Sequence, residues 1–373
     1  MKVFLLFSLL FFSTFYVGCA QDNPPFIENP SEIDYTVETI VDGIDIPWGL
    51  DFITENDFLV TEKSGILYRV LNGEKTAVSG IPDLYVRGQG GLLDIALHPE
   101  FKSNSVIYIT LSTNIGGDDK GGNTSLYSAM LNGNKLENTK LLYKAIPNTK
   151  KGQHWGSRIV FDGEGYLYFS VGDRGNRDVN PQDISRDGGK IYRLNLDGSI
   201  PKDNPFHGKA NAKEAIYSYG HRNPQGMVIH PKTGDIWEHE HGPQGGDEIN
   251  IIKKGLNFGW PEITYGINYS GTPITDKKTL PNMEQPLYYW VPSIGPSGMA
   301  FSTSGIYKNW TDDLFVGSLK FEYLERLVIE NNKVIKREKI LDKIGRVREV
   351  VESPDGFLYI GVEGKGILKI IPN

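Results

Sequence analysis

Residues 347–371 read VREVVESPDGFLYIGVEGKGILKII. Two apolar runs, VREVV and FLYIGV, flank the turn sequence Ser353-Pro354-Asp355-Gly356, and a third run, ILKII, follows Gly366. Short runs rich in Val, Ile, Leu and Tyr that are interrupted by Gly, Pro and Asp are typical of β-strands joined by tight turns. This stretch therefore predicts three consecutive strands.

The same order of segments recurs along the chain. Each unit has an apolar strand, a turn, a second strand rich in Leu, Tyr and Val, and then a charged or glycine-rich rim. The units begin at Trp48, Leu92, Ile159, Met227, Met299 and Val347. Six such units predict an all-β fold, a six-bladed β-propeller over residues 35–373, in which strand Tyr35–Val41 completes the last blade and closes the ring. A pair of β-sandwiches is the alternative interpretation.

The N-terminal segment predicts export. Lys2 precedes an apolar run over residues 3–17, which is too short to span a bilayer comfortably and is typical of a signal sequence. We expect residues 1–20 to be this signal and residues 21–34 to be a linker. Lipidation of Cys19 and ordinary cleavage after Ala20 both fit the residues, so the protein is expected in the periplasm or lipid-anchored at the bacterial cell envelope.

Composition excludes several classes of function. Cys19 is the only cysteine, so the mature chain has no disulfide, no thiolate metal site and no cysteine nucleophile. The net charge is −7 and no Lys/Arg cluster is present, which argues against a nucleic-acid partner. No second long apolar run follows the signal, so a membrane contact is expected only through the lipid anchor.

Polar residues gather in the loops that a propeller would place at one end of its channel. These loops are GQGG (88–91), GQHWGSR (152–158), GDRGNRD (172–178), YGHRNPQG (219–226), EHGPQGGDE (240–248), SLKFE (318–322) and GRVRE (345–349). They contain a histidine, His154, of the type that serves as a general base near neutral pH. They also contain cations on three blades, Arg222, Lys320, Arg346 and Arg348, which together predict a ligand with several carboxylates.

The segment from Glu238 to Asn250, EHEHGPQGGDEIN, is compatible with more than one chemistry. His239 and His241 would share one face of a strand and could bind zinc, but no third ligand is evident. The glycines lack the Lys-Ser/Thr of a phosphate loop. Backbone carbonyls followed by carboxylates are hard oxygen ligands suited to calcium.

Eight motifs in order give the chain a resemblance to a known family. They are GQGGLLDIALHP, HWGSRIVF, YGHRNPQG, EHGPQGGDEIN, NFGWPEITYG, NYSGTP, MEQPLYYWVPSIGPSGMAF and SLK. From Trp48 to Lys369 the chain resembles the soluble glucose/sorbosone dehydrogenases, exported six-bladed propellers that carry pyrroloquinoline quinone (PQQ) and calcium. The segment NYSGTP…MEQP is more similar to the aldose sugar dehydrogenase branch than to the dimeric, glucose-specific branch.

The resemblance implies oxidation of an aldose at the anomeric carbon to a lactone, with hydride transfer to the quinone. By this resemblance His154 is the general base and Asp173 its acidic partner. The implied cofactor-binding residues are Gln89, Arg222, Asn223, Trp290, Ser293, Lys320, Arg346 and Arg348. The carbonyls of Gly242 and Pro243 would hold the catalytic calcium, and Asp247, Glu248 and the backbone of Phe258 would hold a second, structural one.

Some features depart from the family or leave alternatives. Many members have Tyr at the position of Phe258, and some glucose-specific relatives have an acidic residue at the position of Gln153. The short segment Tyr265–Pro286 predicts a monomer with broad sugar preference; the electron acceptor is not identified. A calcium-dependent propeller hydrolase or lactonase and a non-catalytic exported binding propeller are the rival hypotheses. Lys320 with Arg346 and Arg348 argues against the hydrolase, and His154 together with the whole set of cations argues against the binding propeller.

Overall fold

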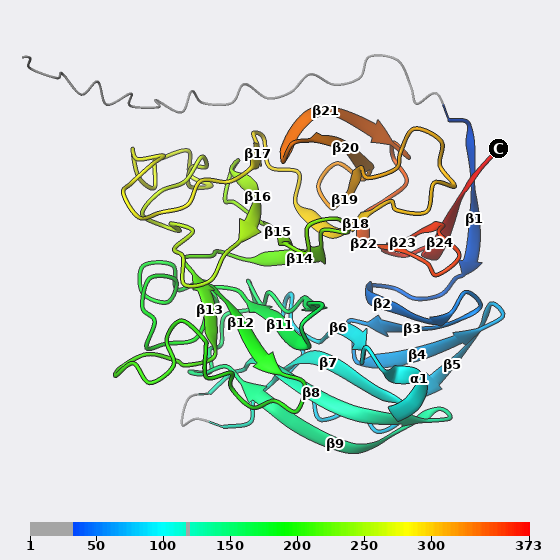
Figure 1. Cartoon of the computed structure of the whole chain (residues 1–373), viewed down its shortest axis with the longest axis horizontal. Helices are drawn as coiled ribbons and strands as arrows, with labels where there is room; N and C mark the ends of the chain where they lie inside the picture. The colour runs from blue at the N-terminus through cyan, green and yellow to red at the C-terminus, as the bar shows by residue number, and fades with distance from the viewer. Residues whose placement is uncertain (1–32, 117–119) are drawn as a thin grey trace, which may run out of the picture.

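The computed structural model describes residues 33–116 and 120–373 (Figure 1). The predicted export signal, Cys19 and most of the predicted linker lie outside the described residues. The strands form six antiparallel sheets of four strands each, arranged around a common centre. The predicted six-bladed β-propeller is confirmed, and the sandwich alternative is excluded.

Each blade is one sheet. Blade 1 contains β2 (Pro47–Thr54), β3 (Asp57–Glu62), β4 (Ile66–Leu71) and β5 (Glu74–Val78), and blade 2 contains β6 (Leu92–Leu97), β7 (Val106–Thr113), β8 (Asn123–Asn132) and β9 (Lys135–Lys144). Blade 3 contains β10 (Ile159–Phe161), β11 (Tyr166–Val171), β12 (Lys190–Asn195) and β13 (Ile216–Tyr219), and blade 4 contains β14 (Pro224–Ile229), β15 (Ile236–Glu240), β16 (Asp247–Ile252) and β17 (Tyr288–Trp290). Blade 5 contains β18 (Pro296–Phe301), β19 (Leu314–Ser318), β20 (Leu324–Glu330) and β21 (Lys333–Ile340), and blade 6 contains β22 (Val347–Glu352), β23 (Leu358–Val362), β24 (Gly366–Pro372) and β1 (Tyr35–Val41). One short helix, α1 (Phe101–Asn104), lies between β6 and β7.

The last blade shows why this sequence forms a propeller. Between β22 and β23, the N–H of Gly356 donates to the carbonyl of Ser353 (2.8 Å), and Gly356 has φ +88°, which favours glycine. Every residue of β23 is buried, as expected of a strand covered on both faces by neighbouring blades. Strand β1 then pairs with β24, with Tyr35 opposite Pro372, so the two ends of the domain close the ring in one sheet (Figure 1).

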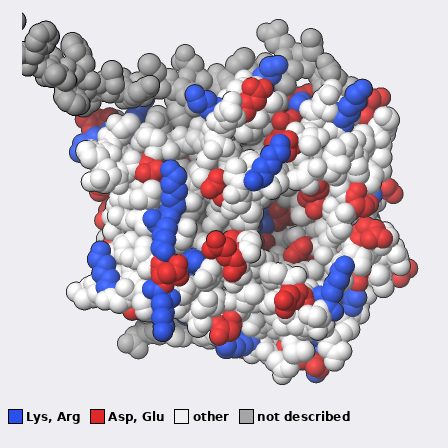
Figure 2. All heavy atoms as spheres, viewed as in Figure 1, with Lys and Arg blue, Asp and Glu red and all other residues white. Residues whose placement is uncertain are grey.

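The first strand of each blade lines the centre of the ring. Consecutive first strands lie side by side from β2 through β6, β10, β14, β18 and β22, and β2 also contacts β22, which completes the circle. Apolar side chains fill the space between blades; Phe315 of blade 5, for example, packs in one cluster with Val350 and Ile360 of blade 6. The face seen in Figure 2 is hollowed near its centre.

A buried ion cluster holds four blades together inside the channel. The Arg158 guanidinium donates to Asp94 of β6 (2.9 Å) and to Glu349 of β22, and it stacks 4.6 Å from the ring of Trp48 in β2. Burial raises the pKa of Glu349 to about 7, with Arg158 opposing the shift. Among the described residues, no helix has the length and apolar character needed to cross a membrane.

Candidate active site

Two cavities meet at one end of the channel. The larger, about 510 Å³, is bordered by Gln89, by Lys320 of blade 5, and by Arg346 and Arg348 at the start of blade 6. The smaller, about 300 Å³, contains His154. The side chain of Gln89 contacts the backbone of His154, so the two spaces adjoin at this pair.

The loop that carries His154 is held in an unusual backbone conformation. His154 has φ +57°, in the left-handed region that most residues avoid. Its N–H donates to Oε1 of Gln89 (2.7 Å), and the N–H of Gln89 donates in return to the carbonyl of Gly152 (2.7 Å). The guanidinium of Arg174 lies 3.3 Å from the ring centre of Trp155, which closes the loop from behind. These contacts fix where the imidazole of His154 lies.

His154 and Asp173 form a hydrogen-bonded pair. Nδ1 of His154 lies 2.6 Å from Oδ1 of Asp173, whose side chain is 1% exposed. Burial and the positive charge of Arg222 lower the pKa of His154, and the hydrogen bond to Asp173 opposes this only in part. Because an ionised carboxylate can only accept, Nδ1 carries the proton and Nε2 of the neutral imidazole is the basic nitrogen.

The carboxylate of Asp173 accepts two further hydrogen bonds. Burial alone would raise its pKa, but the hydrogen bond from His154, followed by the positive charge of Arg222 and the hydrogen bond from Trp260, holds the pKa below its usual value. The indole N–H of Trp260 donates to Oδ2 (2.9 Å), and the N–H of Gly175 donates to Oδ1 (2.6 Å). Asp173 is therefore an ionised, fixed acceptor for the imidazole.

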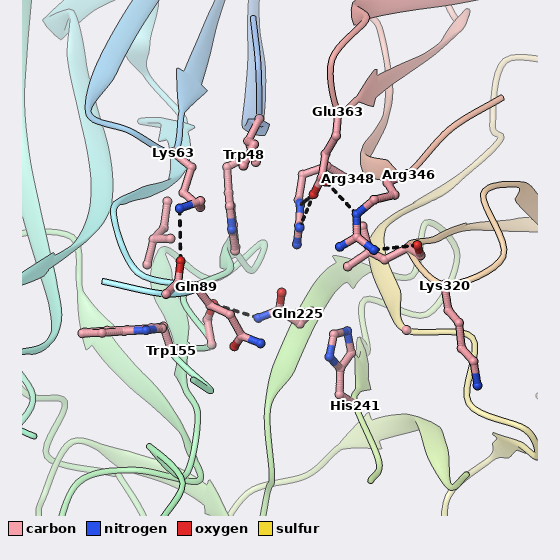
Figure 3. A pocket seen from close by; sticks show the side chains of 16 residues that line it. Trp48, Lys63, Gln89, Trp155, Gln225, His241, Lys320, Arg346, Arg348 and Glu363 are labelled. Atoms are coloured by element: carbon pink, nitrogen blue, oxygen red, sulfur yellow. Dashed lines mark hydrogen bonds and ion pairs between the residues drawn. The ribbon is translucent and has the colours of Figure 1, made fainter. Parts of the chain in front are cut away.

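The larger cavity is lined by cations and contains a single acidic side chain. Its cations are Lys63, Lys320, Arg346 and Arg348, and Glu363 is the one carboxylate among its lining residues (Figure 3). Glu363 contacts both arginines through their Nε atoms. Positive charge on separate blades around one space is the arrangement expected for a flat ligand with several carboxylates.

The loop after β15 is built around Asp247. Its carboxylate accepts the N–H groups of Gly242 (2.8 Å), Ile294 (2.7 Å) and Gly295 (2.9 Å), and burial raises its pKa to about 6. A Cβ at Gly242 would lie 2.2 Å from the backbone of Gly246, so only glycine fits this turn. The hydroxyl of Ser293 donates to the carbonyl of Pro243 (3.1 Å). Asp247 and Ser293 thus set the direction of the loop carbonyls.

A group of buried acids lies beside this loop. Ligand atoms of His221, Glu238 and Glu240 all lie within 4.8 Å of one another, and Glu240 pairs across the sheet with Glu248. Burial, and then the charge of Glu240, raise the pKa values of Glu238 and Glu248 well above the usual range. Oε1 of Glu238 is buried with no hydrogen-bond partner among the described residues. Carboxylates packed this way need a proton or a cation for stability.

The structure places the predicted residues in distinct groups. Gln89, Lys320, Arg346 and Arg348 line the larger cavity, and His154, Asp173, Arg222 and Pro243 line the smaller one. Asn223 lies beneath the His154 loop, where its side-chain oxygen accepts the N–H of Gly156 (3.1 Å). Gly242, Glu248 and Phe258 border a small space beside the acidic group. Trp290 is fully buried and donates to Glu325 (2.9 Å), away from both cavities.

Sequence reasoning missed several residues that border the site. Trp260, Lys63, Glu238, Glu240 and Glu363 belong to this group. Glu238 and Glu240 are two residues apart in a strand. This spacing could have predicted that both carboxylates lie on one face of the sheet. Within the part of the chain that the structure describes, His239 and His241, considered as zinc ligands, belong to no group of three metal-ligating side chains. Nε2 of His241 instead lies 2.5 Å from the carbonyl of Pro296.

Known proteins share this architecture. The sequence profile of the glucose/sorbosone dehydrogenase family matches residues 44–369. Aldose sugar dehydrogenase YliI of Escherichia coli (strain K12) is 40% identical over 90% of this chain and 92% of its own. The solved structure of the soluble aldose sugar dehydrogenase from Escherichia coli in the apo-form superposes with a TM-score of 0.87 at 38% identity, covering 91% of this chain and 100% of that one. The PQQ-bound form of aldose sugar dehydrogenase from Streptomyces coelicolor gives a TM-score of 0.74 at 26% identity, over 94% and 100% of the two chains.

Proposed function

We propose that this chain, which belongs to the glucose/sorbosone dehydrogenase family, oxidises aldose sugars at the anomeric carbon to lactones with PQQ and calcium. The observation that carries the proposal is the junction of two spaces. A neutral histidine oriented by an ionised aspartate lies in one, and four cations line the other. This combination supplies a base for a hydroxyl proton beside a pocket for a polyanionic cofactor.

The cationic cavity fits PQQ. Three carboxylates on a rigid planar ring require cations on several sides, and Lys63, Lys320, Arg346 and Arg348 lie around one space of about 510 Å³. Gln89 would contribute an amide at the edge that faces His154. When bound, the quinone, polarised by calcium, supplies the acceptor for the hydride.

Calcium fits the oxygen-rich loop and the acids behind it. The carbonyls of Gly242 and Pro243 would hold the ion next to the cofactor, in a turn fixed by Asp247 and Ser293. The unpartnered oxygen of Glu238 and the raised pKa values of Glu238 and Glu248 favour a second cation in this region. The resemblance assigns that structural ion to Asp247, Glu248 and the backbone of Phe258. Glu240, opposite Glu248, is a further candidate ligand.

The protein's own contribution to catalysis is proton transfer and orientation. Nε2 of His154 takes the proton of the anomeric hydroxyl, and Asp173 stabilises the imidazolium that forms. Burial, and then the positive charge of Arg222, lower the pKa of the imidazole, so His154 is neutral before the sugar binds. The remaining walls of the smaller cavity, which include Gln153, Arg177 and Asn268, offer hydrogen bonds to sugar hydroxyls.

We also propose that the protein acts outside the cytoplasm. The apolar run over residues 3–17 supports export, either as a soluble periplasmic protein or with Cys19 lipidated. The short segment Tyr265–Pro286 supports a monomer.

Dye-linked aldose oxidation by the purified protein, before and after addition of PQQ and calcium, tests the proposal. We expect activity only when both are added. Binding of PQQ without activity on any aldose would keep the cofactor and refute the sugar assignment. Absence of PQQ binding would refute the cofactor assignment as well.

A further inference from the structure

Glu363 is an acid in a cavity that otherwise presents cations. It directly follows β23 and forms part of the wall of the larger cavity (Figure 3). Its N–H donates to the carbonyl of Arg346 (3.0 Å), so its backbone is fixed to the segment that carries both arginines. A carboxylate placed here would be expected to repel an anionic cofactor, unless it has another role.

The carboxylate of Glu363 binds two guanidinium groups at once. Oε2 accepts from Nε of Arg346 (2.6 Å), while Oε1 accepts from Nε of Arg348 (3.1 Å) and, at shorter range, from Nη2 of the same residue. Nη1 of Arg346 donates to the carbonyl of Leu319 (2.8 Å). Within the described chain, Nη2 of Arg346 and Nη1 of Arg348 take part in none of these bonds and remain as donors.

We propose that Glu363 is a positioning residue for cofactor binding: it holds Arg346 and Arg348 so that their remaining N–H groups point into the cavity toward a carboxylate of the ligand. The inference rests on the proposed PQQ function. Arginine side chains are long and lose considerable rotamer freedom when they are ordered, so fixing two of them beforehand strengthens binding. Glu363 also neutralises part of the repulsion between the two guanidinium groups.

Two roles for Glu363 predict opposite effects of Glu363→Gln. If its charge merely opposes an anionic ligand, the variant binds PQQ more tightly. If it positions the arginines, the variant binds more weakly, because an amide has one acceptor oxygen where the carboxylate has two and its NH₂ group faces guanidinium donors. We expect roughly 5- to 150-fold weaker binding, the range for ordering two such side chains on association.

The experiment is an equilibrium titration of the calcium-supplemented protein with PQQ, in which tryptophan fluorescence or absorbance reports binding. It compares wild type, Glu363→Gln and Glu363→Asp. Glu330→Gln, at the exposed end of β20, is the matched control for loss of one negative charge and should bind like wild type. Glu363→Asp keeps the charge but shortens the arm. It should bind more weakly than wild type, and unchanged affinity would overturn the inference even if Glu363→Gln did not fold.

A double-mutant cycle separates positioning from a purely structural role. If Glu363 acts through the two arginines, Glu363→Gln should cost less binding in the Arg348→Gln background than in wild type, because only its hold on Arg346 is then left to lose. Additive losses, or tighter binding by Glu363→Gln, would refute the inference while leaving the cofactor assignment intact. Wild-type protein that does not bind PQQ would instead refute the proposed function, and the inference with it.

Discussion

Replacing Asp173 with Asn tests the histidine–aspartate pair most sharply. Asp173 accepts Nδ1–H of His154 on one oxygen and the indole N–H of Trp260 on the other, so both oxygens face donors. Asn offers one oxygen and one NH₂ group, so one of these donors must lose its acceptor. The substitution is almost isosteric and leaves the shape of the buried site unchanged, which makes a loss of activity attributable to the hydrogen bonds and the charge.

The expected size follows from the bond that is lost. A charge-assisted hydrogen bond contributes about 1.5–3 kcal/mol, and it strengthens when His154 becomes an imidazolium in the transition state. Since each 1.36 kcal/mol is a factor of ten in rate, kcat should fall roughly 10- to 150-fold. KM should change less, because the larger part of the interaction is made when the proton moves.

The pH dependence of kcat/KM gives a second, independent test of Asp173→Asn. The hydrogen bond and charge of Asp173 raise the pKa of His154, so their removal lowers it further below the ordinary value. A general base works when unprotonated, and therefore the acidic limb of kcat/KM should move to lower pH in the variant. Steady-state kinetics of the PQQ- and calcium-loaded protein between about pH 5 and pH 9 would measure both effects. Unchanged kcat, or an acidic limb that moves to higher pH, would contradict the proposed role.

Three further predictions concern the surroundings of the site. Trp260→Phe removes the indole N–H that helps to lower the pKa of Asp173. We expect kcat to fall several-fold with an unchanged unfolding temperature. Activity equal to wild type would exclude a positioning role for Trp260. Arg158→Met leaves Asp94 and Glu349 buried without their shared cation. We expect it to lower the free energy of unfolding, measured by denaturant titration, by about 3–5 kcal/mol. A change below about 1 kcal/mol would show that the cluster is not needed for stability. Adding a chelator to the calcium-supplemented protein should lower the unfolding temperature, because Glu238 and Glu248 must then take up protons in place of the proposed cation. Calorimetry before and after chelation measures this, and identical transitions would argue against a structural cation.

The fold was predictable because its signal is repeated. Each blade carries its own turns and apolar strands, and the six starting residues predicted from the sequence lie in, or begin, the first strands β2, β6, β10, β14, β18 and β22. The closing strand β1 was predictable as well, since residues 35–41, rich in the strand formers Tyr, Thr, Val and Ile, match the strand that the last blade lacks. The buried cluster around Arg158 was not predicted, because it joins residues far apart in the chain whose inward orientation depends on how neighbouring blades are rotated.

The site residues that belong to the loop motifs were predictable from the sequence, but the residues that support them were not. His154, Asp173 and the cations lie in loops with clear sequence signatures, and the structure brings them to two adjoining cavities. Trp260 was missed because an indole N–H aimed at a carboxylate has no sequence pattern. Glu363 was missed because a lone acid at a strand end is ordinarily a solvated surface group.

Single-turnover reduction of the PQQ- and calcium-loaded protein by glucose, compared with glucose carrying deuterium at C1, tests whether His154 assists hydride transfer from the sugar. In the wild-type protein we expect the cofactor absorbance to change more slowly with the deuterated sugar, because the C1–H bond breaks in the step that His154 assists. We expect His154→Ala, with PQQ bound, to be reduced at least 100-fold more slowly, since a positioned base contributes roughly 10²–10⁴ in rate. Reduction that is indifferent to deuterium and unaffected by loss of His154 would contradict the proposed role of His154.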